Sequence, residues 1–198
     1  LKPNTISWSK RLPSQKLIHE ISKTKNLLIV LPAHFELNER VSFSFVLSKD
    51  PRHTFNMIIS KYFKKSFPAK IAKTAIIDDN VSDKGNLYIG DYSKLSGKIK
   101  FGKNCYVGDK CVINGPIKFG DNVEILSGAV IGLESLGVTF EDTVPKLFPQ
   151  LSGLEIGNNC RIGVNCSVSK GTLDNTILGD NVMLGDFSHV GHNANIGN

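Results

Sequence analysis

The chain has 198 residues, 40% hydrophobic and 21% charged, a composition that excludes intrinsic disorder and allows one or two domains. The formal net charge of +6 is uneven, because residues 1–72 carry 13 Lys and Arg against 4 Asp and Glu, whereas residues 73–198 carry 11 against 14. A basic N-terminal part suits phosphate-bearing or acidic partners and is compatible with contact at a membrane surface. The sequence has no apolar run of transmembrane length, zinc-finger spacing or RNA-binding signature, so we expect no transmembrane segment and no nucleic acid.

The N-terminal residues predict a small α/β domain. Leu27–Leu31 has the pattern of a buried strand, Val41–Leu47 alternates as a second strand, and Pro13–Ile21 suits a short helix. Asp50 can cap a further helix that starts at Pro51 and continues to about residue 64. The predicted domains are residues 1–50 for binding a nucleotide sugar, a linking helix in 51–70, and a repeat domain over 71–198.

Large apolar residues recur at every sixth position in the repeat domain. A period of six fits neither a helix nor a simple strand, so each unit predicts a short strand and a tight corner, and three units close one coil of 18 residues. This is the pattern of a β-solenoid, a parallel β-helix of hexapeptide repeats, and known solenoids of this repeat class wind left-handed. The column consists of Ile71, Ile77, Ile89, Leu95, Phe101, Val107, Ile113, Phe119, Ile125, Ile131, Ile156, Ile162, Val168, Leu178, Leu184, Val190 and Ile196, with Asp83 as the exception.

The four cysteines follow the same repeat. Cys105, Cys111, Cys160 and Cys166 each lie four residues after a column position, in a slot that holds Ala or Ser elsewhere. Cysteines six residues apart belong to neighbouring walls of the coil, so neither a disulfide nor a metal cluster is expected. We predict small, reduced core residues and a cytoplasmic protein.

A loop insertion over 133–153 interrupts the period. Segments of this length inside regular architecture are usually functional loops or disordered ones, and this one contains several large apolar side chains. They could cover the solenoid's own side, or they could form an apolar groove for a substrate chain or a neighbouring subunit. The side chains are Leu136, Val138, Phe140, Leu147 and Phe148.

Two of the five histidines flank an inward residue of the column. With Val190 inside, His189 and His192 lie outside, near a glycine corner where a ligand could approach closely. Imidazole titrates near neutral pH and can accept a proton from an amine or a hydroxyl group. Two surface histidines are more often merely solvated, so both interpretations remain open at this point. Asp186 is close enough in sequence to orient a histidine.

Several segments of the chain together match the pattern of one enzyme family. The segments are Asp50-Pro-Arg52, Ser127-Gly-Ala-Val-Ile-Gly132, Leu147-Phe-Pro-Gln-Leu-Ser-Gly153, Gly171-Thr-Leu-Asp-Asn-Thr-Ile-Leu-Gly179 and His189-Val-Gly-His-Asn193. Hexapeptide repeats alone are unspecific, but their combination with these segments is more specific. The combination resembles UDP-3-O-acylglucosamine N-acyltransferase of lipid A biosynthesis. The resemblance extends from about Ile6 to the end of the chain, and weakly includes Ile6-Ser-Trp8.

The resemblance implies a homotrimer with active sites between neighbouring solenoids. It implies transfer of a 3-hydroxyacyl chain from acyl carrier protein to the amine of a UDP-glucosamine derivative, with no metal or other cofactor. His192 matches the family's general base, and backbone N–H groups would hold the oxyanion. Trp8 would stack on the uracil. The remaining predicted substrate contacts are His189, Asn193, Asp186 and Phe148.

The sequence also departs from the family. Arg11 and Ser14 replace an asparagine and a tyrosine of the uridine pocket, and Gly185-Asp186 replaces Asp-Asn. The chain ends inside a repeat at Asn198, so we expect it to be truncated or divergent. Two alternatives follow: an acetyl-CoA-dependent acetyltransferase of an amino sugar on the same solenoid, or a non-catalytic relative that serves as a binding scaffold.

Overall fold

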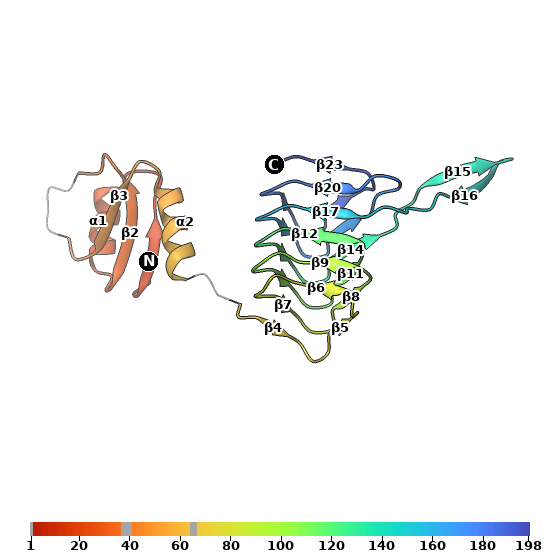
Figure 1. The fold of residues 1–198 in the computed structure, drawn as a ribbon. Coiled ribbons are helices and arrows are strands. Elements are labelled where there is room, and N and C mark those ends of the chain that lie inside the picture. The colour runs from red at the N-terminus through yellow and green to blue at the C-terminus, as the bar shows by residue number, and fades with distance from the viewer. Residues whose placement is uncertain (1, 37–40, 64–66) are drawn as a thin grey trace. The chain divides into compact units, whose positions relative to one another are not determined.

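The computed structural model describes residues 2–36, 41–63 and 67–198. It forms two compact units, Leu1–Ser66 and Phe67–Asn198. The first unit contains a parallel sheet in the order β1-β2-β3, with bounds Thr5–Trp8, Leu27–Pro32 and Ser44–Ser48 (Figure 1). Side chains from β2 and the adjoining segments pack into its core, which consists of Ile21, Leu27, Ile29, Leu31, Phe35 and Phe43.

Two capped helices complete this unit. Helix α1, Gln15–Ser22, begins after Ser14, whose hydroxyl accepts a hydrogen bond from the N–H of Leu17 at 3.3 Å. Helix α2, Pro51–Tyr62, begins after Asp50, whose carboxylate accepts from the N–H of His53 at 3.0 Å. Residue 64, the predicted end of this helix, lies outside the described residues. Helix α2 packs against β1, β2 and β3 and belongs to the first unit.

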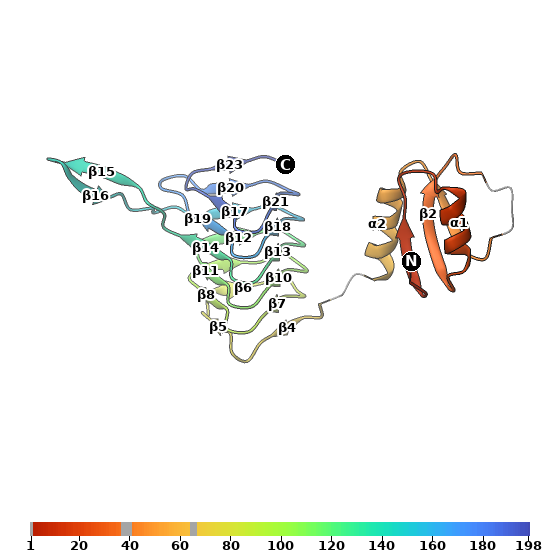
Figure 2. The same cartoon turned by 180° about the vertical axis from the view of Figure 1, so that it is seen from behind.

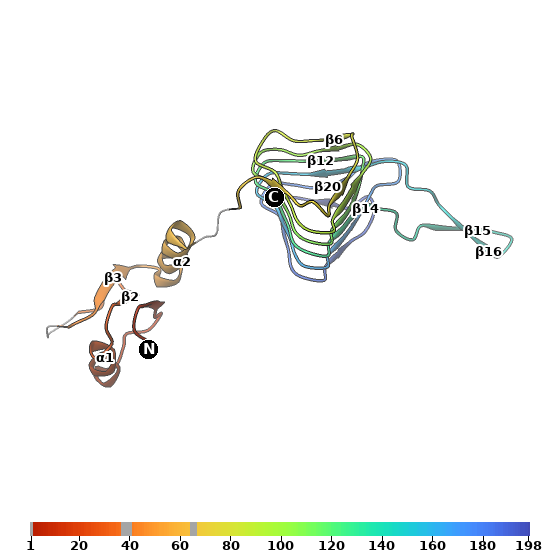
Figure 3. The same cartoon turned by 90° about the horizontal axis from the view of Figure 1, so that it is seen from below.

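The second unit is a parallel β-helix with three walls of six strands each (Figures 2 and 3). Wall 1 contains β4 Lys70–Ile71, β7 Tyr88–Ile89, β10 Tyr106–Val107, β13 Glu124–Ile125, β18 Arg161–Ile162 and β21 Met183–Leu184. Wall 2 contains β5 Ile76–Ile77, β8 Lys94–Ser96, β11 Val112–Asn114, β14 Val130–Leu133, β19 Ser167–Ser169 and β22 His189–Val190. Wall 3 contains β6 Val81–Ser82, β9 Ile99–Lys100, β12 Ile117–Phe119, β17 Leu154–Ile156, β20 Thr176–Leu178 and β23 Asn195–Ile196.

The predicted apolar column lies inside these walls. Ile89, Leu95, Val107, Ile113 and others are fully buried, and they form one continuous core. Ile71, in the first coil, is 56% exposed. The glycines after column positions allow the coils to stack, since a Cβ on Gly108 would lie 2.6 Å from the backbone nitrogen of Ser127 in the next coil.

Hydrogen bonds between polar side chains, or between a side chain and the backbone, join successive coils at two of the three corners. At the corner from wall 3 to wall 1, each Asn side chain donates to the next one, at 2.9 to 3.3 Å. These residues have φ between +55° and +61°, a backbone conformation that Asn tolerates. At the corner from wall 1 to wall 2, Asp109 accepts from the N–H of Asp91 at 2.8 Å. The Asn ladder consists of Asn86, Asn104, Asn122, Asn159 and Asn181.

The cysteines occupy the small inward slot, as predicted. All four are unpaired and buried, and their thiols contact carbonyls of the adjacent coil, for example Cys160 Sγ to the oxygen of Gly179 at 3.0 Å. Burial raises the pKa of the thiols of Cys105, Cys111 and Cys160, so these groups are protonated at neutral pH.

We expect the native protein to protect its thiols from Ellman's reagent at pH 7. All four should react once the chain is unfolded in guanidinium, because unfolding exposes the buried thiols to the reagent. Absorbance at 412 nm before and after denaturation gives the count. Rapid labelling of even one thiol in the native state would contradict the packing described above.

Candidate active site

Both insertions into the repeat lie at the corner from wall 2 to wall 3, here called the open corner. Strands stacked in a wall are 18 residues apart in the first coils, but 37 separate Glu124 from Arg161 and 22 separate Arg161 from Met183. The first insertion, between Glu124 and Arg161, contains an antiparallel hairpin of β15, Val138–Glu141, and β16, Val144–Leu147. The second is a short loop between β19 and β20, residues 170–175.

His192 lies at the open corner, one coil beyond that short loop. Its side chain is half-buried, and its Nδ1 is 2.9 Å from Oδ1 of Asn193 and 3.3 Å from Oγ1 of Thr172. Thr172 lies in the loop of residues 170–175, which makes its coil four residues longer than the first coils. This insertion therefore supplies a direct contact to the imidazole. The sequence signal for this contact is the change of phase between Val168 and Leu178, which are ten residues apart rather than six or twelve.

The contacts of Asn193 fix the tautomer of this imidazole. Oδ1 of Asn193 also accepts from the N–H of Thr172 at 3.1 Å, and its Nδ2 donates to the carbonyl of Asp174 at 3.1 Å. The oxygen must therefore face His192, and Nδ1–H of the neutral ring donates to it. Nε2 keeps its lone pair. This arrangement holds the ring in one orientation and makes Nε2 of His192 a candidate general base.

The other predicted residues near the histidine are located elsewhere. Asp186 lies at the corner from wall 1 to wall 2, and its carboxylate accepts from the N–H of Val164 at 2.8 Å. His192 lies at a different corner, and its Nδ1 contacts Asn193 and Thr172 rather than Asp186. His189 lies on wall 2, is exposed, and its Nδ1 is 2.7 Å from Oγ of Ser167.

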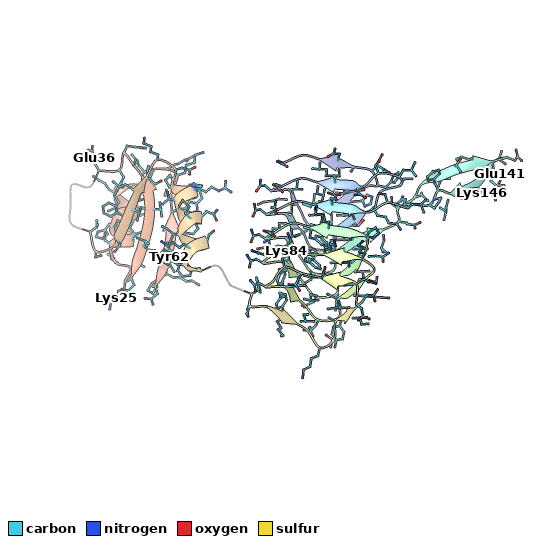
Figure 4. All side chains as sticks on the ribbon, viewed as in Figure 1. Lys25, Glu36, Tyr62, Lys84, Glu141 and Lys146 are labelled. Carbon is cyan, nitrogen blue, oxygen red and sulfur yellow. The ribbon has the colours of Figure 1, made fainter. Side chains whose placement is uncertain are left out.

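The hairpin forms an arm that extends away from the coils (Figures 1 and 3). At its base the buried side chain of Gln150 accepts from the N–H of Ser135 at 3.0 Å and donates to its carbonyl at 2.9 Å. Near its tip Lys146 pairs with Glu141 at 3.5 Å (Figure 4). The apolar side chains of the arm are 40–77% exposed, so they do not cover the solenoid's own side: Leu136, Val138, Phe140, Leu147 and Phe148.

The first unit has its own hollow at the carboxyl ends of β1 and β2 and the start of α2. It has a volume of about 790 Å³ and is lined by Trp8, Lys10, Pro32, Ala33, His34, Lys49, Asp50, Pro51 and Arg52. Three cations against one carboxylate give it a positive balance. Ser14, one of the departures from the uridine pocket, caps α1, and Arg11 is exposed.

In the part of the chain that the structure describes, we find no cluster of metal-binding side chains and no helix suited to cross a membrane. Over residues 2–36, 41–63 and 67–198, no three His, Cys, Asp or Glu side chains gather closely enough to hold a metal ion. No described helix is long and apolar enough to cross a bilayer.

Comparison with known proteins relates the chain to one enzyme class. No protein-family model matches it. UDP-3-O-acylglucosamine N-acyltransferase of Dechloromonas aromatica is 36% identical over 74 residues, which cover 37% of this chain and 21% of that protein. The protein of the same name from Hydrogenovibrio crunogenus is 25% identical over 212 residues, covering 98% of this chain and 60% of that protein. The first match thus spans about a fifth of its relative's length.

Solved structures identify the fold. UDP-N-acetylglucosamine O-acyltransferase of Moraxella catarrhalis matches with a TM-score of 0.57 and 24% identity, over 64% of this chain and 48% of that one. The UDP-N-acetylglucosamine acyltransferase of Francisella novicida also gives 0.57, at 22% identity over 65% and 45% of the two chains. The predicted left-handed parallel β-helix is confirmed. This chain is a hexapeptide-repeat β-helix protein related in sequence to the UDP-3-O-acylglucosamine N-acyltransferases.

Proposed function

We propose that this protein is an N-acyltransferase that moves a 3-hydroxyacyl chain from acyl carrier protein to the amine of a UDP-glucosamine derivative. The observation that carries the proposal is the fixed tautomer of His192, which leaves Nε2 able to accept a proton. The relatives named above add support, since their names specify N-acylation of a UDP-linked amino sugar.

In the proposed reaction the substrate amine attacks the carbonyl carbon of the acyl thioester. Nε2 of His192 accepts the proton that the nitrogen loses as the C–N bond forms. The tetrahedral intermediate then collapses, the C–S bond breaks, and the imidazolium returns the proton to the departing thiolate. The products are an amide and the free thiol of the carrier, and no cofactor is consumed. Asn193 and Thr172 keep the ring oriented throughout.

The nucleotide of the acceptor is assigned to the first unit. Trp8 provides a flat apolar face for the uracil, and Lys10, Lys49 and Arg52 give the surrounding hollow a positive charge that attracts an anionic nucleotide. These groups support binding of a nucleotide even though Arg11 and Ser14 differ from the family's pocket.

We further propose a homotrimer in the cytoplasm. The arm exposes large apolar residues, among them Leu136 at 77% and Phe140 at 70%, and such surfaces are usually covered by another chain or by a ligand. The reduced cysteines fit a cytoplasmic compartment. In this assembly Phe148 and the base of the arm would contact the acyl chain, and light scattering would give the subunit number.

The donor test compares two thioesters with UDP-glucosamine as acceptor. The complete protein is incubated with 3-hydroxyacyl carrier protein or with acetyl-CoA, and thiol release and the mass of the acylated sugar are measured. We expect kcat/KM with the acylated carrier to be at least about 100-fold higher, because a longer chain and a carrier surface add binding energy in the transition state. A preference for acetyl-CoA would indicate the acetyltransferase, and no transfer from either donor would favour the scaffold.

A further inference from the structure

The open corner contains a second feature, a hollow on the side of the histidine loop towards β4. It has a volume of about 240 Å³, and three exposed lysines line it. We call it the lysine groove. Its lining consists of Lys98, Lys100, Pro116, Ile117, Lys118, Gly153, Leu154, Glu155 and Asn175.

The strand register of wall 3 brings these charges together. Lys118 pairs with Lys100 on one side and with Glu155 on the other, so the three outward side chains follow one another at about 4.8 Å. Like charges directly opposite each other destabilise a sheet. Within the described residues none of the three lysines forms an ion pair, and Glu155 is the one acidic side chain that lines the groove beside them.

The one carboxylate of the groove is already engaged. Oε1 of Glu155 accepts from Nδ2 of Asn175 at 3.0 Å. Oδ1 of Asn175 in turn accepts from the hydroxyl of Ser152 at 2.7 Å and the N–H of Gly153 at 2.9 Å. Three ammonium groups against one carboxylate leave a local charge of about +2, and the hydrogen bonds fix the edge of the groove nearest the histidine.

The groove adjoins the residues that hold His192. Asn175 follows Asp174, whose carbonyl accepts the amide of Asn193, and that amide orients the imidazole. In wall 3, Lys118 is two strands away from β20, a distance of about 10 Å. The loop that contacts His192 ends where β20 begins. A substrate with its phosphate in the groove could therefore reach the candidate base with its reacting group.

We infer that the lysine groove binds the phosphate groups of a substrate of this enzyme. Clustered ammonium groups are suited to phosphate, each acting as a point charge with three donors. The inference rests on the proposed function for the identity of the ligand, and two sources share its chemistry: the diphosphate of the nucleotide-sugar acceptor and the phosphodiester of the donor's pantetheine arm.

The test measures binding of inorganic pyrophosphate to the complete protein by isothermal titration calorimetry. The triple variant K98A/K100A/K118A is expected to bind at least about tenfold more weakly than the wild type. The control K70A/K94A/K103A removes the same charge from exposed lysines elsewhere on the solenoid and is expected to change the affinity by less than about twofold. Far-UV circular dichroism verifies that both variants are folded.

Competition then identifies the source of the phosphate. Only the pyrophosphate binding that is lost in K98A/K100A/K118A is followed. Its displacement by UDP-N-acetylglucosamine would assign the groove to the acceptor, and its displacement by 4′-phosphopantetheine would assign it to the donor. Absence of pyrophosphate binding, equal losses in the two triple variants, or displacement by neither ligand would overturn the inference.

Different results would contradict the phosphate site and the proposed acyl transfer. If K98A/K100A/K118A transferred acyl groups with an unchanged KM for both substrates, phosphate binding in the groove would be wrong, but the proposed acyltransferase activity would stand. Pyrophosphate binding that depends on the lysines, in a protein that transfers no acyl group, would retain the anion site and remove the reaction.

Discussion

Replacement of His192 by Ala is expected to lower kcat for acyl transfer by about 10²- to 10⁴-fold, the range typical of a lost general base. The amine must lose a proton as it becomes an amide, and water replaces a fixed imidazole poorly. KM for the acceptor should change little, because the ring is assigned to proton transfer rather than to nucleotide binding. Initial rates of thiol release at saturating donor give both quantities.

The control for this variant is His19→Ala, which removes an exposed histidine from α1. We expect its kcat to match that of the wild type. The comparison shows whether the loss of activity is specific to His192 or follows from removing any histidine. If His192→Ala transferred acyl groups at the wild-type rate, the assignment of the base would be wrong. The scaffold interpretation would then gain support.

Phe101→Ala is expected to have the largest effect on stability, a loss of about 3–5 kcal/mol in the free energy of unfolding of the β-helix. Phe101 is 2% exposed and stacks on Phe119, with ring centroids 4.7 Å apart and planes 4° from parallel. Truncation leaves a cavity that the stacked coils close only partly, since their spacing is set by backbone hydrogen bonds. Guanidinium unfolding followed by far-UV circular dichroism measures the change.

Two internal comparisons make this result interpretable. The only tryptophan, Trp8, lies in the first unit, so its fluorescence should report a transition that Phe101→Ala leaves unchanged. Met183→Ala on wall 1 removes a side chain that is 74% exposed and should cost less than about 0.5 kcal/mol. Equal losses for the two variants would show that position 101 lies outside the core.

The repeat made most of the β-helix predictable. A side chain such as Ile113 or Val168 faces inward because three six-residue units return the chain to the same wall, and this periodicity depends on local sequence alone. The same repeat predicts from the sequence alone that Cys105 and Cys166 occupy the small inward slot. The capped start of α2 was equally local, since Asp50 and Pro51 suffice to begin a helix.

The candidate site depended on contacts that the period does not encode. Nearness in sequence favours Asp186 as the group that orients the histidine, but the two residues lie at different corners, at opposite ends of β22. Thr172 contacts the imidazole because four extra residues widen the coil before it, and such an insertion has no fixed conformation of its own. The exposed arm was likewise unpredictable, since apolar residues in a loop do not specify what covers them.

What the sequence by itself determined was therefore the fold of the solenoid, its inward column and the candidate base. Only the tertiary structure decided which residues hold His192 and which charges meet in the lysine groove. The physical reason is that stacking brings together residues 98, 118, 155 and 175, and the distance along the chain between them is altered by both insertions. Local periodicity defines a wall, whereas a site at a corner depends on how many residues each coil contains.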